Sequence, residues 1–179
     1  MEHPADVVDL DPVRLRRWRA DDAATLDRIV AESLAHLRPW SLWAVDHDLD
    51  AAVAFLADCE DRWRAGTAYH YAITTGGAVV GGCGLMRRIG PGGLEIGYWL
   101  HAGRTGRGFA TAAAAALVRE GFRLDGTDRM EIHHDVANEA SAAVPRRLGF
   151  AEVERRSVPP GSSAPAELGT DVIWRILPG

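Results

Sequence analysis

A glycine-rich turn flanked by arginines is the part of the sequence whose residue types point most directly to a ligand. Residues 105–111 read Thr-Gly-Arg-Gly-Phe-Ala-Thr and lie between an expected strand and an alanine-rich expected helix. Glycine lets a backbone approach a ligand closely, and the free N–H groups at a helix N-terminus bind anions. Arg104 and Arg107 add positive charge, and the Thr111 hydroxyl adds a donor. The turn therefore predicts a phosphate-binding site. The alternative is an entry loop without a ligand, because short glycine patterns are common.

The same turn lacks only the last glycine of G-x-G-x-x-G, the dinucleotide-binding fingerprint. That fingerprint places its glycines against the end of a strand, inside a βαβ unit. Here His101 to Thr105 separate Leu100 from Gly106, and the turn follows an antiparallel hairpin in the middle of the chain. A nicotinamide site is therefore the weaker interpretation of this turn.

The elements around the turn follow from hydrophobic periodicity and turn residues. The stretches that read as strands are Val13–Arg19, Tyr69–Thr74, Ala78–Arg87, Leu94–Leu100, Met130–Val136, Phe150–Val158 and Asp171–Leu177. The stretches with helical spacing are 23–34, Leu49–Ala65, 109–122 and Asn138–Leu148. Asp21 is the expected N-cap of the first helix, and Thr75-Gly76-Gly77 is the expected turn of a hairpin. The order predicts an α/β (α+β) fold, a mixed and mostly antiparallel sheet of about seven strands flanked by about four helices.

Length and composition bound the class of protein. The chain has 179 residues, 47% hydrophobic and 25% charged, which predicts a single domain over residues 1–179 with its own core. A net charge of −5 argues against a nucleic-acid partner, and no apolar run is long enough to cross a bilayer. The N-terminus lacks the apolar segment of a signal peptide, so we expect a cytoplasmic protein. Cys59 and Cys83 form no close-spaced pair, which predicts neither a metal site nor a disulfide framework.

Several segments, in this order and spacing, resemble the GNAT superfamily of N-acetyltransferases. They are Leu94-Glu95-Ile96-Gly97-Tyr98-Trp99-Leu100, the turn Gly106 to Thr111 with its alanine-rich helix, Asn138-Glu139-Ala140-Ser141, and Arg147-Leu148-Gly149-Phe150. Within the superfamily they are similar to the RimJ/RimL branch, which acetylates N-terminal amines of ribosomal proteins and includes relatives with other acceptors. The resemblance implies the GNAT fold, with a V-shaped splay between the fourth and fifth strands.

The resemblance also implies a site for acetyl-CoA as co-substrate. The superfamily signature Q/R-x-x-G-x-G/A maps onto Thr105, Gly108 and Ala110, and Thr105 departs from the usual Gln or Arg. The strand that ends in Tyr98-Trp99-Leu100 is implied to pair its backbone with the pantetheine arm. Asn138 is implied to bind near that arm or to act as a helix N-cap. The other positions implied to contact the coenzyme are Gly106, Arg107, Phe109, Thr111 and Ser141.

Acyl transfer to an amine needs a neutral amine, a donor for the thioester oxygen and a stabilised leaving thiolate. The resemblance implies Glu95 as the base, acting directly or through water, with a solvated strand residue as the alternative. His70, His133 and His134 are reserve candidates. Ser141 matches the position where this branch carries a serine near the coenzyme sulfur, and would hydrogen-bond the thiolate. Otherwise it is a residue in the first turn of a helix.

The loop between the first two expected helices contains Trp40 and Trp43, and the resemblance places this loop at the acceptor pocket. Exposed aromatic rings there would clamp an apolar or planar acceptor, and the alternative is that both belong to the core. We expect an amine acceptor, either a protein N-terminus or a small molecule, and a monomer or homodimer. The alternative functions are a coenzyme A-binding regulatory module without turnover and a transferase of a longer acyl group, such as succinyl.

Overall fold

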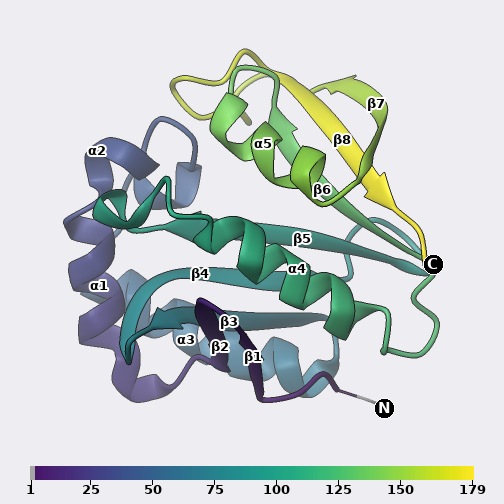
Figure 1. Cartoon of the computed structure of the whole chain (residues 1–179). Coiled ribbons are helices and arrows are strands. Elements are labelled where there is room, and N and C mark those ends of the chain that lie inside the picture. The colour runs from purple at the N-terminus through teal and green to yellow at the C-terminus, as the bar shows by residue number, and fades with distance from the viewer. Residues whose placement is uncertain (1–2) are drawn as a thin grey trace.

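One sheet of eight strands carries helices on both of its faces (Figure 1). The computed structural model describes residues 3–179. The strands are β1 (Val7–Leu10), β2 (Val13–Arg17), β3 (Ala68–Thr75), β4 (Ala78–Met86), β5 (Gly93–Leu100), β6 (Arg129–Asp135), β7 (Ala151–Ser157) and β8 (Thr170–Ile176). The helices are α1 (Ala23–Ala31), α2 (Leu34–Leu37), α3 (Leu49–Ala65), α4 (Phe109–Gly121) and α5 (Glu139–Arg147). The spatial order of the strands is β1-β2-β3-β4-β5-β6-β8-β7.

Antiparallel pairing joins every pair of neighbouring strands except β5 and β6. The hairpin between β3 and β4 turns at Gly76 and Gly77, whose φ angles are 55° and 81°. Positive φ at both central residues is what a two-residue hairpin turn requires, so the predicted turn is confirmed.

The parallel pair β5 and β6 is joined only at its beginning. Its register runs from Gly93↔Arg129 to Glu95↔Glu131. Beyond that point β5 continues to Leu100 and β6 to Asp135, and in Figure 1 the two strands diverge. Among residues 3–179, each strand therefore keeps one edge of backbone groups without a strand partner along the rest of its length. This V-shaped opening confirms the predicted splay, and we call its closed end, at Glu95 and Glu131, the vertex.

The two faces of the sheet are covered by different helices. In Figure 1, α4 lies in front of the sheet and α3 behind it. On the α4 side, Leu94, Ile96 and Leu117 belong to the large core cluster. On the other side, Val30 and Leu56 form a second cluster with Ala72 of β3. Residues that alternate along β5 and β6 therefore face either the α4 core or the side of α1 and α3.

The predicted mixed α/β architecture is confirmed, and the structure differs from the prediction in two details. The sheet has eight strands rather than about seven, because the short acidic stretch Val7–Leu10 pairs with β2. Asp21 is not the N-cap of α1, since Asp22 occupies that position. The Asp22 carboxylate instead accepts hydrogen bonds from the Arg16 guanidinium at 2.7 Å and from the Arg19 N–H at 2.9 Å. The predicted helix Leu49–Ala65 has the same bounds in the structure.

Candidate active site

The glycine-rich turn joins the end of β5 to the start of α4. Gly106 and Gly108 have φ angles of 71° and 79°, a left-handed conformation that glycine adopts without strain. A Cβ built at either position meets nothing within 4 Å, so the space over the turn is open. No described side chain caps the N-terminus of α4, which leaves its first N–H groups directed at that space. The turn therefore has the geometry of an anion site.

Some side chains of the turn stabilise its conformation, and others are exposed to solvent. The Thr105 hydroxyl donates to the Ala102 carbonyl at 3.1 Å and so stabilises the turn. Phe109 is buried in the α4 core, which anchors the first residue of the helix. Arg107 is exposed and Arg104 is half-buried. Backbone N–H groups and one freely exposed guanidinium are therefore the groups available to a phosphate.

Tyr98 reaches across the V from β5 to α5. Its hydroxyl donates to the Ser141 carbonyl at 3.1 Å and lies 3.2 Å from Ser141 Oγ. Burial raises the pKa of Tyr98 to about 12, and the hydrogen bond to Ser141 opposes this only in part. The phenol is therefore neutral at physiological pH. This contact places the Ser141 hydroxyl at the opening between β5 and α5.

Asn138 and Pro145 explain how Ser141 is held in α5. Asn138 is the N-cap of the helix, and its Oδ1 accepts from the Ser141 N–H at 3.0 Å. Pro145, four residues after Ser141, lies inside the helix and has no N–H to donate to the Ser141 carbonyl. The Tyr98 hydroxyl supplies that missing donor. Asn138 thus acts as the cap that its sequence position allowed.

Glu95 is buried beside the vertex, on the face opposite α4. Its residue is 8% exposed, and Leu94 and Ile96 on either side point into the α4 core. Arg88 Nε donates to Glu95 Oε2 at 2.7 Å, and Arg88 Nη2 bonds the other carboxylate oxygen. Both carboxylate oxygens are therefore engaged by one guanidinium, in the bidentate geometry of a strong charge-assisted pair.

Three further residues lie next to Arg88 and Glu95. We call the resulting group of five the vertex cluster: Arg88, Glu95, Glu131, His133 and Arg175. Glu131 is 4% exposed and accepts from Arg175 at 2.6 and 2.8 Å. His133 Nε2 lies 2.7 Å from Glu131 Oε2, and His133 Nδ1 lies 3.9 Å from Glu95 Oε2. Burial alone would raise the pKa of Glu131, but the hydrogen bonds from His133 and Arg175 outweigh it and hold that pKa below its ordinary value.

Sequence reasoning found Glu95 and His133 but missed the other members of this cluster. A local signal for Glu131 exists, because Met130 and Ile132 are apolar while Glu131 and His133 alternate with them on the opposite face. Arg88 and Arg175 carried no such signal. Their contacts depend on which strands become neighbours in the sheet.

The other two reserve histidines occupy different positions. His134 is buried on the far side of β6, where its Nε2 accepts from Trp174 Nε1 at 2.9 Å and its Nδ1 donates to the Asp135 carbonyl at 2.8 Å. Both ring nitrogens are thus used within the core. Burial lowers the pKa of His70 to about 4, which keeps that ring neutral.

A cavity of about 600 Å³ opens on the face of α1 and α3, beside the V. Its lining includes Gly97 and Tyr98 of β5 together with Arg88 of the vertex cluster. Trp43 also lines it, with a ring centroid 5.5 Å from that of Trp99. Trp40 lies in the same loop but outside the set of described residues that line this cavity. The cavity therefore approaches the V from the side opposite α4, and we call it the acceptor-side cavity.

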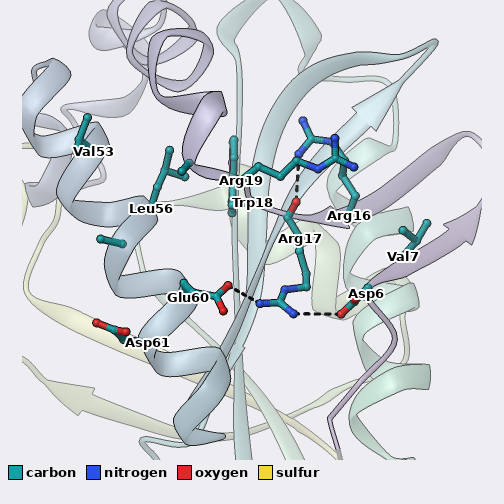
Figure 2. A pocket seen from close by; sticks show the side chains of 12 residues that line it. Asp6, Val7, Arg16, Arg17, Trp18, Arg19, Val53, Leu56, Glu60 and Asp61 are labelled. Carbon is teal, nitrogen blue, oxygen red and sulfur yellow. Dashed lines mark hydrogen bonds and ion pairs between the residues drawn. The ribbon is translucent and has the colours of Figure 1, made fainter.

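A larger hollow of about 880 Å³ lies between β2 and α3 (Figure 2). Three of its charged groups are already paired with one another, since Arg17 bonds Asp6 at 3.3 Å and Glu60 at 2.5 Å. It shares only Trp18 with the described lining of the acceptor-side cavity. Size alone therefore does not identify the chemical centre, and the described lining of this hollow includes no member of the vertex cluster.

Two further findings concern metals and membranes. Among residues 3–179, no group of three or more His, Cys, Asp or Glu side chains is placed to hold a metal ion. Within the same part of the chain, no helix is both long and apolar enough to cross a membrane.

Comparison with known proteins places this geometry among acetyltransferases. Residues 13–151 match the acetyltransferase (GNAT) domain family. The chain is 28% identical over 150 residues to the Bacillus subtilis (strain 168) protein named "Putative ribosomal N-acetyltransferase YdaF", a match that covers 78% of each chain. It is similar to Mycobacterium smegmatis RimJ in complex with CoA-disulfide, with a TM-score of 0.87 and 27% identity over 98% of this chain and 90% of that one. The fold also matches RimL, a ribosomal L7/L12 alpha-N-protein acetyltransferase bound to coenzyme A. That match has a TM-score of 0.86 and 20% identity, and covers 96% of this chain and 97% of that one.

Proposed function

The chain belongs to the acetyltransferase (GNAT) domain family, and from this premise we propose that it transfers acetyl to the N-terminal amine of a protein. Family membership makes it an acetyl-CoA-dependent N-acetyltransferase, so the proposal concerns the acceptor and the residues that act. The acceptor class is supported by the printed names of YdaF, a putative ribosomal N-acetyltransferase, and RimL, a ribosomal L7/L12 alpha-N-protein acetyltransferase.

The observation that carries the proposal is the continuity between the anion site and the open edge of β5. The turn at Gly106 and Gly108 lies directly after the end of β5, and β5 has no strand partner on its β6 side beyond Glu95 within residues 3–179. A ligand with phosphates at one end and an extended amide-bearing arm fits both features at once. The turn would hold the phosphates, and the free edge of β5 from Leu100 toward Gly97 would pair with the arm. The thioester would then lie near the vertex.

The proposed roles of the remaining residues follow from where they lie. Ser141 Oγ lies beside the Tyr98 hydroxyl at the opening between β5 and α5, where its O–H would donate to the leaving sulfur. Glu95 supplies negative charge beside the vertex, where an incoming ammonium must lose a proton. Asn138 fixes the first turn of α5 through the Ser141 N–H. Tyr98 holds the Ser141 carbonyl.

The acceptor-side cavity supplies a route for the amine that does not cross the coenzyme. Its wall at Gly97 belongs to the strand that would carry the pantetheine arm. Trp43 is 49% exposed, so its ring is available to cover the first side chain of an entering peptide. An extended N-terminus could therefore reach the vertex from this face.

A thiol-release assay with acetyl-CoA tests the proposal. The acceptors are a peptide with a free N-terminus, the same peptide N-acetylated but with a lysine side chain, and a small primary amine. We expect thiol release with the free N-terminus and little with the other two. Release only with lysine or the small amine would overturn the proposed acceptor. Tight coenzyme binding without release on any acceptor would support the regulatory module instead. Faster turnover of succinyl-CoA than of acetyl-CoA would show that the protein transfers a longer acyl group.

A further inference from the structure

His133 lies two residues beyond the vertex on β6, one of the two strands that bound the open V. The last β5–β6 pair is Glu95↔Glu131, so His133 stands where a partner for Gly97 would be if the pairing continued. Side chains two residues apart on a strand share a face, which puts His133 on the face of Glu131, opposite the α4 core. Gly97 itself lines the acceptor-side cavity. His133 therefore lies beside the V on the same face of the sheet as Gly97.

The hydrogen bond to Glu131 fixes which nitrogen of His133 carries a hydrogen. An ionised carboxylate only accepts hydrogen bonds, so the nitrogen 2.7 Å from it must be the donor. Glu131 is held ionised because Arg175 donates to it twice, at 2.6 and 2.8 Å. In the neutral ring the hydrogen is thus on Nε2, and Nδ1 keeps a lone pair. Nδ1 is the atom that can accept a proton.

Glu95 makes the position in front of Nδ1 favourable for a cation. Its Oε2 lies 3.9 Å from Nδ1, too far for a hydrogen bond but close enough for strong electrostatic attraction. Two acceptors therefore face each other without a hydrogen between them. An ammonium group is attracted to this position, and once Nδ1 takes a proton the resulting imidazolium is stabilised by the same carboxylate.

We infer that the Glu131–His133 pair is the general base of the reaction, with Nδ1 of His133 as the atom that takes the proton of the acceptor amine. Glu131 and Glu95 are positioning residues, since the first fixes the tautomer and the second stabilises the imidazolium. This inference rests on the proposed function and deepens it. It moves the proton-accepting role from Glu95, which Arg88 already holds, to the neighbouring ring.

The steps balance without any further reactant. The ammonium R–NH₃⁺ gives one proton to His133 Nδ1, and the neutral amine attacks the thioester carbon. The new N–C bond forms, the C–S bond breaks, and its electron pair stays on sulfur, where Ser141 Oγ–H donates to it. The nitrogen then loses a second proton, which neutralises the thiolate. The products are the amide, the free thiol of coenzyme A and one proton, which His133 releases to water.

The test compares His133→Ala with the native protein in the thiol-release assay, with acetyl-CoA affinity and thermal unfolding measured on both. General base catalysis contributes about 10²–10⁴-fold, so we expect turnover to fall at least about 100-fold while coenzyme affinity changes little. Added imidazole should restore part of the lost rate. Among peptides that differ in their N-terminal residue, the loss should also be larger for the α-amines of higher pKa, because the more basic amine depends more on a base.

Three further variants keep the test decisive if His133→Ala folds poorly. His133→Asn preserves most of the side-chain volume and should show the same loss of turnover, without imidazole rescue. His3→Asn alters an exposed histidine near the N-terminus and should leave turnover unchanged. Glu131→Gln should lower turnover with a smaller change in the coenzyme KM, because an amide no longer enforces the tautomer.

The outcomes separate this inference from the function on which it rests. If the native protein releases thiol and His133→Ala releases it equally fast, His133 is not the base and the proposed function stands. If the native protein binds acetyl-CoA but releases no thiol with any amine, both proposals fall. If His133→Ala is slow and imidazole restores it with a steeper dependence on amine basicity, the inference is supported.

Discussion

Replacing Tyr98 with phenylalanine tests how α5 is held against β5. The hydroxyl bonds both the Ser141 carbonyl and Ser141 Oγ, at 3.1 and 3.2 Å. Because Pro145 has no N–H, the variant leaves that carbonyl without a donor. A buried group left unsatisfied costs about 1–3 kcal/mol, so we expect a loss of about 2 kcal/mol in the free energy of unfolding. For a chain of this length that corresponds to a fall in Tm of roughly 4–8 °C.

Pro145→Ala gives the carbonyl a donor within the helix, which makes the prediction a double-mutant cycle. In that background Tyr98→Phe removes only the contact with Ser141 Oγ, and its cost should drop to about 1 kcal/mol. The expected coupling energy is therefore about 1 kcal/mol. The effect of losing the proline on the unfolded chain is common to both proteins that carry Pro145→Ala, so it cancels in the cycle.

Urea unfolding of the four proteins, followed by tryptophan fluorescence, measures this coupling. Tyr71→Phe is the matched control, because the Tyr71 hydroxyl bonds the Ala5 carbonyl at 2.8 Å, far along the chain from α5. Its cost should be the same with and without Pro145. If Tyr98→Phe also costs the same in both backgrounds, Tyr98 does not serve the orphan carbonyl and the reasoning is refuted.

Three further predictions concern single residues. Glu95→Gln should lower turnover much more than coenzyme affinity, and an unchanged rate would remove Glu95 from the mechanism. Gly108→Ala should cost about 1–2 kcal/mol of stability, because φ is 79°, and should also weaken acetyl-CoA binding in a calorimetric titration. Its control is Gly126→Ala, which has φ 74° and equally open space and should cost similar stability without affecting the coenzyme; equal affinity losses would refute the site. Burial alone would raise the pKa of Asp135, but four backbone N–H groups hold it below its ordinary value. Its stabilisation is therefore present above the unfolded pKa of about 3.9 and lost as pH falls through the lower folded value. Asp135→Asn should cost about 2 kcal/mol in the free energy of unfolding at pH 7. It should also reduce the dependence of that free energy on pH in the acidic range, and an unchanged dependence would contradict this.

The parts of the fold that could be predicted are those governed by local pattern. The helix Leu49–Ala65 has an Asp48 cap and a left-handed Gly66 at its end, so its bounds follow from the residues themselves. The anion turn is equally local, because its glycines and the helix start are adjacent in sequence. The strand Val7–Leu10 was missed because it is only four residues long and acquires its pairing from β2.

The vertex cluster could not be assembled from sequence for a physical reason. Glu95 meets Glu131 through the parallel register of β5 and β6, and Glu131 meets Arg175 through the antiparallel register of β6 and β8. Those registers depend on tertiary packing, because Glu131 and Arg175 lie 44 residues apart in the sequence. The roles of Trp40 and Trp43 differ for a similar reason. Only the folded loop decides which ring faces the acceptor-side cavity.

The most direct test of the central claim is mass spectrometry of an acceptor peptide after incubation with isotopically labelled acetyl-CoA and the native protein. The peptide carries both a free N-terminus and an internal lysine, and fragmentation locates the label. We predict one labelled acetyl group on the α-amine and none on the lysine side chain, with matching release of thiol. Label on the lysine alone, or bound coenzyme with no labelled peptide, would contradict transfer of acetyl to a protein N-terminus.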